Sequence, residues 1–228
     1  MTSPTPLVLS RGLNVVHLFC HPVGQVDAGA VRKAVDEAVD AGLQVVTAAI
    51  LGAKADACFM VLGADLWDLR KFQSKIQAAG LKVAESYVSV TEVSEYAAGM
   101  PEKMINDRLF PVLPPEGMRA FCFYPMSKRR GEEHNWYALS YEERDQLMRQ
   151  HGALGREFRG RVLQVVTGST GLDDWEWGVT LFGAHIDDLK ECVYTMRFDE
   201  ATTLYGEFGA FYTGLVGTVD EVLDATMA

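Results

Sequence analysis

The sequence predicts an α+β protein made of two ferredoxin-like halves whose sheets close into one barrel, a dimeric α+β barrel with the helices outside. The main observation is that strand and helix patterns follow one another in the same order in the two halves of the chain. A shift of 120 residues also aligns GADL at residues 63–66 with GAHI at residues 183–186, which favours an internal duplication. Joining the two sheets would also remove open sheet edges, which otherwise promote aggregation.

The N-terminal half, residues 1–97, contains the segments of one ferredoxin-like unit. It begins with NVVHLFC at residues 14–20, a short apolar run typical of a buried strand. Gly42 and Gly80 follow the two segments with helical spacing and are expected to end those helices. The predicted elements are a helix over residues 28–41, a hairpin over 45–51 and 57–62, a helix over 65–79 and a strand over 81–93.

Residues 98–140 form the connection between the halves, and proline is frequent in its first part. Long connections inside compact domains are usually functional. A strand within this connection places Ala120, Cys122 and Tyr124 on one face and is expected to end at Pro125. The C-terminal half, residues 141–228, repeats the earlier plan, with strands over residues 161–167 and 175–182 and a helix over 186–196.

Composition and charge limit the possible classes of function. The chain has 228 residues and a formal net charge of −10, which argues against binding nucleic acid and against docking on an anionic membrane. Its four cysteines show no CxxC pairing, so the sequence predicts neither a zinc site nor a disulfide framework. We expect neither a targeting segment nor a bilayer-spanning run, and therefore a protein of the reducing cytoplasm.

A histidine near the end of a predicted helix is the first candidate for metal binding. The SYEE run at residues 140–143 is a capping-box pattern, and it opens a helix that continues through Gln150 to His151. His151 lies four residues after Leu147 and therefore on the same helix face, where it could bind a haem iron. Spacing alone favours the simpler interpretation of a polar helix end whose histidine interacts with the helix dipole.

Other polar side chains could also line a pocket. Gln164 shares a strand face with Val162 and Val166, where a buried glutamine needs hydrogen-bond partners. Tyr124 could be a hydrogen-bond donor or a redox-active phenol beside a metal cofactor, although most such tyrosines are simply core-edge residues. Cations that could bind carboxylates lie near these elements at three positions, Arg108, Lys128 and Arg156.

Four segments together point to one family more specifically than any single residue does. They are FCFYPMSKRR, NWYALSYEERDQLMRQHGALGR, QVVTGSTGLDDWEWGVTLF and YTMRFDEATTLYGEFGAFYTG, and they fall within residues 108–214. The chain resembles the coproheme decarboxylases of the chlorite dismutase superfamily and is most similar to their Firmicutes-like branch. This resemblance implies the duplicated barrel described above, assembled as a homopentamer.

The resemblance also implies a role for each candidate residue. His151 corresponds to the proximal iron ligand, Tyr124 to the catalytic tyrosine of the YPM motif, and Gln164 to the distal position thirteen residues after the histidine. Chlorite dismutases place an arginine at that position to hold an anionic leaving group, so the neutral Gln164 favours the decarboxylase branch. The residues that correspond to contacts with the porphyrin and its propionates are Arg108, Lys128, Arg156, Tyr87, Ser89, Thr202 and Met126.

The activity implied by the resemblance is the peroxide-dependent decarboxylation of two propionates of iron coproporphyrin III to vinyl groups, which gives haem b. Iron coproporphyrin is then both substrate and redox centre, and a coproporphyrin ferrochelatase is the expected transient partner. Two other functions stay open, a chlorite dismutase-like haem peroxidase and a haem carrier or sensor without catalysis. A barrel protein that binds no haem is disfavoured by His151 and by the basic residues.

Overall fold

The computed structural model describes residues 4–97 and 99–227. The strands are β1 Asn14–Pro22, β2 Gln44–Ile50, β3 Ala57–Gly63, β4 Leu81–Thr91, β5 Ala120–Lys128, β6 Val162–Gly168, β7 Trp177–Gly183, β8 Gly206–Phe208 and β9 Tyr212–Gly217. The helices are α1 Ala28–Asp40, α2 Leu66–Ala78, α3 Glu102–Leu109, α4 Tyr141–Arg156, α5 Ile186–Met196, α6 Glu200–Thr203 and α7 Val219–Met227, with a 3-10 turn η1 at Trp136–Ala138. No helix in these two described ranges combines the length and the apolar character that crossing a membrane requires.

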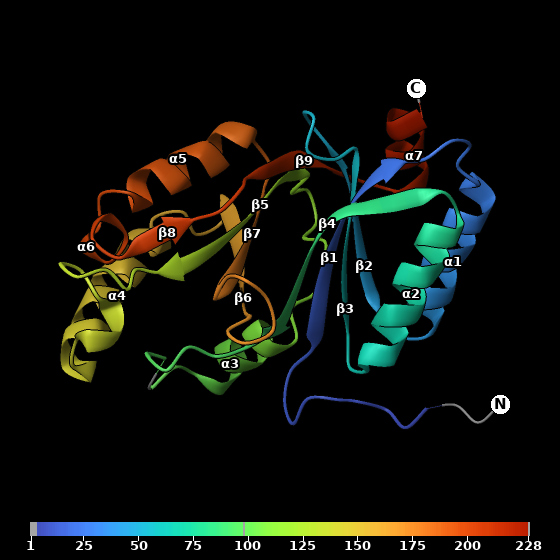
Figure 1. The fold of residues 1–228 in the computed structure, drawn as a ribbon. Helices are drawn as coiled ribbons and strands as arrows, with labels where there is room; N and C mark the ends of the chain where they lie inside the picture. The colour runs from blue at the N-terminus through green and yellow to red at the C-terminus, as the bar shows by residue number, and fades with distance from the viewer. Residues whose placement is uncertain (1–3, 98, 228) are drawn as a thin grey trace.

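The nine strands of the described residues belong to one antiparallel sheet whose pairings return to their starting point. The strand order is β4-β1-β3-β2 in the first half of the chain and β9-β5-β7-β6 in the second half. These two sets are joined where β2 pairs with β9 and where β4 pairs with β6. Since helices accompany this antiparallel sheet in both halves (Figure 1), the predicted α+β class is confirmed.

One face of the sheet carries a core to which both halves contribute. Phe19 and Met60 from the first half pack in one cluster with Phe121, Phe123 and Phe182 from the second half, and each of these side chains is at most 1% exposed. The rings of Phe19 and Phe123 lie 5.4 Å apart. Complete burial of a side chain of this size contributes about 1.5–3 kcal/mol, so this cluster ties the two halves together.

Helices cover the opposite face of the sheet (Figure 1). In the first half, α1 and α2 pack over the strands through Val31, Phe72 and Ile76, and α7 joins them through Leu223. In the second half, α5 packs through Leu189 in the cluster that also holds residues of β5 and β7. The shorter α6 and the longer α4 lie beside α5 at the far end of the molecule from α1 (Figure 1).

The two copies of the repeated motif occupy equivalent places in the structure. Gly63 ends β3 and Gly183 ends β7, and a helix begins three residues later in each case. A side chain at either glycine would come within 2.9 Å of the leucine in the following helix, Leu69 or Leu189. A β-carbon at either position would force this leucine to shift, so glycine at both positions allows the strand end to pack closely against the helix.

The helix that carries His151 is longer than the sequence pattern predicts. It continues through Gly152 and Gly155 and ends at Arg156. Glycine inside a helix costs about 1 kcal/mol relative to alanine, which lowers the helix propensity without forbidding the helix. His151 is therefore an internal residue of α4, and the interpretation of this histidine as a helix end is wrong.

The connection between the halves also differs from expectation. It contains the unexpected helix α3, and β5 does not end at Pro125 but continues to Lys128. On one edge of β5, residues 120–123 pair with β9 and residues 126–128 pair with β8. Pro125 lies in the interval between these two pairings, where its missing N–H removes no ladder hydrogen bond.

Candidate functional site

Tyr124 and Gln164 lie on the same face of the sheet. Tyr124 is paired with Val179 of β7, and Gln164 is paired with Leu181 of the same strand. Directly paired residues share a face, as do residues two apart along a strand, so all four side chains point to the helix-covered side. Two strand spacings and an offset of two residues put the Cα atoms of Tyr124 and Gln164 about 12 Å apart.

His151 is held by a carboxylate. Its Nδ1 donates a hydrogen bond of 3.0 Å to Asp199 Oδ2, and Asp199 itself is buried. Burial alone would raise the pKa of the Asp199 carboxyl, but hydrogen bonds from His151 and Thr202 together hold that pKa below its usual range. Because Nδ1 is occupied, Nε2 is the nitrogen left with a lone pair, as in metal-binding histidines.

The one-turn helix α6 brings Lys128 to the same place. Lys128 Nζ donates a hydrogen bond of 2.8 Å to the carbonyl oxygen of Ala201 and lies 4.3 Å from the centre of the Trp136 ring. Asp199 caps α6 by accepting from the N–H of Thr202, which is buried. Burial lowers the pKa of Lys128 to about 8, against the opposing charges of Asp199 and Glu176.

Tyr124 is buried in an aromatic cluster. Its ring stacks on Phe211 at a centroid distance of 4.5 Å and lies 5.7 Å from Phe208. Burial raises the pKa of the Tyr124 phenol, and the nearby Arg197 opposes this effect only in part. The phenol is therefore protonated at neutral pH and can donate a hydrogen atom or a hydrogen bond.

The helix face around His151 and the sheet face around Gln164 are incompletely covered. No residue of α4 is fully buried, although Leu147 and Met148 pack against the cluster around Trp136. On β6, Val166 is 42% exposed and Gln164 is exposed as well. Apolar surfaces of this kind beside a defined polar group commonly mark ligand sites.

A separate cavity of about 550 Å³ adjoins the aromatic cluster, and its lining in the described part of the chain includes neither His151 nor Gln164. Phe211 both lines this cavity and stacks on Tyr124. The cavity therefore lies beside the predicted site, on the side of Tyr124 that faces α5 and β9. Its lining residues are Cys122, Ile186, Leu189, Lys190, Val193, Tyr194, Arg197, Phe198, Phe211 and Thr213.

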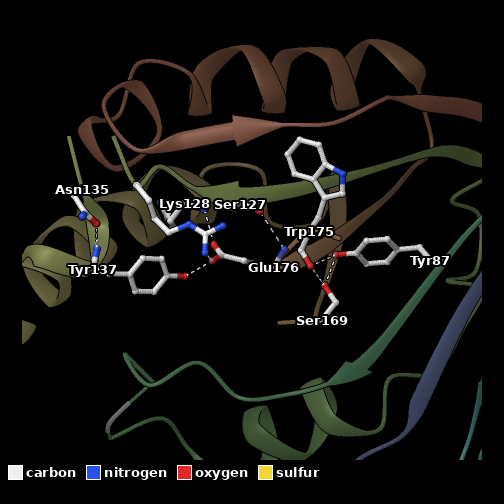
Figure 2. A network of polar contacts seen from close by, with 9 residues as sticks. Tyr87, Ser127, Lys128, Asn135, Tyr137, Ser169, Trp175 and Glu176 are labelled. Carbon is white, nitrogen blue, oxygen red and sulfur yellow. Dashed lines mark hydrogen bonds and ion pairs between the residues drawn. The ribbon is translucent and has the colours of Figure 1, made fainter. Parts of the chain in front are cut away.

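Two predicted contact residues are not brought to this site. Tyr87 and Ser89 lie on β4 and are buried on the opposite face of the sheet, where Tyr87 packs against Phe123. The Tyr87 hydroxyl is hydrogen-bonded to the Ser169 hydroxyl and, at 3.3 Å, to the carbonyl oxygen of Trp175 (Figure 2). Neither side chain can reach a ligand beside Tyr124 without leaving this core, so their expected role in binding a propionate is not supported.

The two predicted arginines lie at helix ends and are both exposed. Arg156 ends α4, and its guanidinium lies back along the helix beside Gly152, which follows His151. Arg108 lies in the last turn of α3. Met126 lies between Tyr124 and Lys128 on β5 and packs at the edge of the Tyr124 cluster. The structure thus gathers Lys128, Thr202 and Arg156 near His151 and places Met126 beside Tyr124, whereas no contact in the described residues ties Arg108 to either group.

Sequence reasoning missed several residues that shape this site. Asp199 fixes His151 from 48 positions away, and no local pattern reveals such a partner. The ring of Trp136 contacts the ammonium group of Lys128. The only sequence signal for this contact was that Trp136 lies shortly before the capping box that opens α4. Arg197, at the end of α5, lies over the Phe208 ring at 4.5 Å and so belongs to the surroundings of Tyr124.

Comparison with known proteins finds relatives by sequence and by structure. The family model described as chlorite dismutase matches residues 26–217. Coproheme decarboxylases from Staphylococcus saprophyticus and Staphylococcus carnosus are 44% and 45% identical, covering 77% and 73% of this chain and 74% and 70% of theirs. A haem-binding protein from Thermus thermophilus superposes with a TM-score of 0.85 at 33% identity, covering 98% of each chain.

A more distant structure shares the fold. A mutant chlorite dismutase from Candidatus Nitrospira defluvii superposes with a TM-score of 0.75 at 20% identity, covering 96% of this chain and 98% of the other. Fold and site together define an α+β protein that presents a carboxylate-held imidazole and a buried tyrosine on the helix-covered side of its sheet. The chain belongs to the chlorite dismutase family, and within it to the group that contains the coproheme decarboxylases.

Proposed function

We propose that this chain is a coproheme decarboxylase, which uses hydrogen peroxide to convert two propionates of iron coproporphyrin III to vinyl groups and so forms haem b. The observation that supports the proposal is that α6 links His151, through Asp199, to Lys128, through Ala201, and that Lys128 lies on the same strand, β5, as the buried Tyr124. The relatives named coproheme decarboxylase add independent support.

The residues present fit an iron porphyrin. The imidazole of His151 has a buried carboxylate behind Nδ1 and no hydrogen-bond partner for Nε2 among the described residues, which is the arrangement that favours metal binding. Val166 and the apolar face of α4 offer incompletely covered surface to a flat macrocycle. When bound, the iron of coproheme supplies the oxidising chemistry after reaction with peroxide.

The propionates of the substrate need cations or hydrogen-bond donors, because an unpaired buried carboxylate is very costly. We infer that Lys128 and Arg156 bind propionates near His151, with the Thr202 hydroxyl as a further donor and Met126 against the edge of the porphyrin. We propose the exposed Arg108, in the last turn of α3, as a further cation that binds a propionate. These cations give a local positive site to a protein whose net charge is −10.

Tyr124 is the proposed catalytic residue. Its phenol would give up a hydrogen atom and then take one from the β-carbon of the propionate beside it, which regenerates the phenol. Loss of carbon dioxide and of one more electron leaves a vinyl group. Each propionate thus yields one carbon dioxide and two electrons, and one hydrogen peroxide is reduced to two water molecules. Holding the phenol close to the reacting carbon is the main contribution of the protein.

Gln164 is proposed to handle the peroxide on the distal side. Its side chain is neutral and therefore cannot hold an anionic leaving group by charge, so the chlorite dismutase-like alternative is disfavoured. A haem carrier or sensor would explain the imidazole of His151 but gives no role to the buried phenol of Tyr124.

We further infer that residues 1–97 and 141–228 are duplicated ferredoxin-like halves, which form a dimeric α+β barrel with the strand of the connection at residues 98–140. The equivalent strand orders and the matching Gly63 and Gly183 positions support this inference. By resemblance to the family, we propose a cytoplasmic homopentamer that receives its substrate from a coproporphyrin ferrochelatase.

The direct test is to mix the purified chain with iron coproporphyrin III, add hydrogen peroxide and follow the product masses. We expect two successive losses that correspond to carbon dioxide and two hydrogens. Spectral binding of the porphyrin without these losses would favour the carrier or sensor, and rapid oxygen release from chlorite would favour the peroxidase.

Replacing the catalytic phenol gives a sharper version of this test. Tyr124→Phe keeps the ring that stacks on Phe211 but removes the hydroxyl, so we expect normal binding of iron coproporphyrin and loss of decarboxylation. Binding is measured by absorption titration and turnover by mass spectrometry. Full turnover by this variant would exclude the proposed radical role of Tyr124.

A further inference from the structure

Glu176 is a buried carboxylate just before β7, and the reaction outlined above gives it no role. Its side chain is 7% exposed, and each of its oxygens accepts a hydrogen bond. Oε2 accepts from the backbone N–H of Lys128 at 2.7 Å, and Oε1 accepts from the hydroxyl of Tyr137 at 2.6 Å (Figure 2). Arg130 lies 3.9 Å from Oε1 as its cationic neighbour.

The carboxylate joins the end of β5 to the turn η1. The pairing of β5 with β7 ends at Met126, so the backbone N–H of Lys128 has no partner on β7. Glu176 accepts this hydrogen bond instead. The Glu176 N–H donates to the carbonyl oxygen of Met126 at 3.1 Å and to Ser127 Oγ at 3.2 Å, which fixes the carboxylate relative to β5. Through Tyr137 the same group holds η1 in place.

The segment that carries Glu176 is anchored in turn to the core. The carbonyl oxygen of Trp175 accepts hydrogen bonds from the hydroxyls of Ser169, at 2.8 Å, and Tyr87, at 3.3 Å (Figure 2). Tyr87 belongs to β4, so this network extends from the first half of the chain to the site around Lys128. Tyr87 therefore contributes to the site indirectly, by holding the backbone of Trp175, the residue before Glu176.

Lys128 is consequently fixed at both of its ends. Its backbone is held by Glu176, and its ammonium group is held by Ala201 and by the ring of Trp136, the residue before Tyr137. Tyr124 and Lys128 lie four residues apart on one strand face, so their Cα atoms are about 13 Å apart. A propionate bound at Lys128 would thus determine which part of the macrocycle lies beside Tyr124.

We propose that Glu176 is a positioning residue that determines which propionate of the substrate is presented to Tyr124. It acts through Lys128 and Trp136 and touches no reacting atom. This inference rests on the proposed decarboxylase function and adds to it a determinant of the order in which the propionates react.

The test compares Glu176→Ala with Glu176→Gln. Glutamine can accept from the Lys128 N–H with its carbonyl oxygen and donate to the Tyr137 hydroxyl oxygen with its amide, whereas alanine can do neither. Glu37→Gln serves as the control, because Glu37 is on α1 and forms a surface ion pair with Lys75. Each variant is assayed for KM, kcat and the proportion of product that still carries three propionates.

We expect Glu176→Ala to raise KM for iron coproporphyrin at least about tenfold and to let the three-propionate product accumulate. Glu176→Gln should restore both quantities to within about threefold of the natural chain. Altered proportions of product distinguish a positioning role from a loss of folded protein, which lowers total activity without changing the proportions. Thermal unfolding of each variant measures the folded fraction.

Three outcomes would overturn the proposal. They are a folded Glu176→Ala variant with natural KM and product proportions, an equal defect in Glu176→Gln, and a similar defect in Glu37→Gln. If Glu176→Ala does not fold, Tyr137→Phe removes only the bond to η1 and should give the same shift in product proportions on a smaller scale; unchanged proportions would then refute the proposal. Absence of any decarboxylation by the natural chain would instead refute the proposed function.

Discussion

The hydrogen bond between His151 and Asp199 decides which imidazole nitrogen faces a ligand. A carboxylate can accept a hydrogen bond only from a nitrogen that carries a proton, so Nδ1 carries the proton and Nε2 keeps the lone pair. The negative charge behind the ring also makes Nε2 a stronger metal ligand. Asp199 lies at the start of α6, and the position of that short helix therefore determines how the imidazole of His151 is oriented.

Asp199→Asn should weaken iron binding without removing it. The asparagine oxygen can still accept from Nδ1, so the ring keeps its orientation but loses the charge behind it. We expect about tenfold weaker binding of iron coproporphyrin, measured by absorption titration. Asp145→Asn, which removes a surface ion pair with Arg149 on α4, is the matched control. Equal affinities for both variants would show that the Asp199 charge is irrelevant to the ligand.

His17 is a second buried histidine with a different consequence. Its ring lies 4.3 Å from the Phe123 ring, its Nε2 is 3.0 Å from Thr180 Oγ1, and its Nδ1 has no partner among the described residues. Burial lowers the pKa of His17 to about 3 from the ordinary value of 6.5. The native protein therefore holds this side chain neutral at pH values where the unfolded chain protonates it.

This difference makes the free energy of unfolding depend on pH. Below the unfolded pKa of about 6.5 the unfolded state binds one more proton at residue 17, so stability falls by up to about 1.4 kcal/mol per pH unit. The loss continues until the pH reaches the native pKa of about 3. His17→Gln removes the titrating group and should flatten this dependence. Urea unfolding of both proteins between about pH 7 and about pH 5 measures it; parallel pH profiles would contradict the assignment.

The helix α4 shows how a local element positions one functional side chain. Ser140 and Glu143 form a full capping box at its start, which fixes the helix from its first turn. Two glycines near its end leave the turn after His151 with little side-chain bulk. The helix is thus anchored at one end and open at the other, where a bound macrocycle could contact it.

Glycine has opposite effects in two elements, and this gives a paired prediction. At Gly183 a methyl group would come within 2.9 Å of Leu189 and 3.3 Å of a backbone oxygen, so Gly183→Ala should destabilise the fold by about 1–3 kcal/mol. At Gly155 in α4 a methyl group would meet nothing within 4 Å, so Gly155→Ala should stabilise it by about 0.5–1 kcal/mol. Urea unfolding of the two variants should show shifts of opposite sign, and shifts of the same sign would refute the argument.

The strand pairings form a closed ring, so the stability of each half of the chain depends on the other half. The core on one face of the sheet contains side chains from both halves, so neither half can keep its part of that core alone. The seams at β2–β9 and β4–β6 also satisfy backbone groups that would otherwise be open edges. We therefore expect the chain to unfold as a single cooperative unit.

Hydrogen exchange in rising urea can measure this cooperativity. Peptides from β3 and from β7 should lose protection at the same urea concentration. Phe19→Leu, in the first half, should lower that concentration equally for both strands, since Phe19 packs on Phe123 and Tyr212 of the second half. The conservative Val39→Ala, at an exposed position of α1, should leave it unchanged. Persistent protection of one strand after the other has exchanged would show that the halves unfold independently.

The sequence by itself determined the elements whose pattern is local. Apolar and β-rich runs identified most strands, apolar residues at helical spacing identified most helices, and the capping box identified the start of α4. The four family segments identified the family to which the chain belongs. The course of β5 past Pro125 and the extension of α4 to Arg156 were missed, because partner strands and helix packing outweigh the local preferences of proline and glycine.

Only the tertiary structure decided which side chains meet. His151 and Asp199 are 48 residues apart, and Glu176 lies 48 residues from Lys128, so no local periodicity links either pair. Tyr87 and Ser89 alternate correctly for one strand face, but that face turned out to be the core side of the sheet. Period-two spacing tells which residues share a face, whereas strand order and the covering helices determine whether that face meets the core or a ligand.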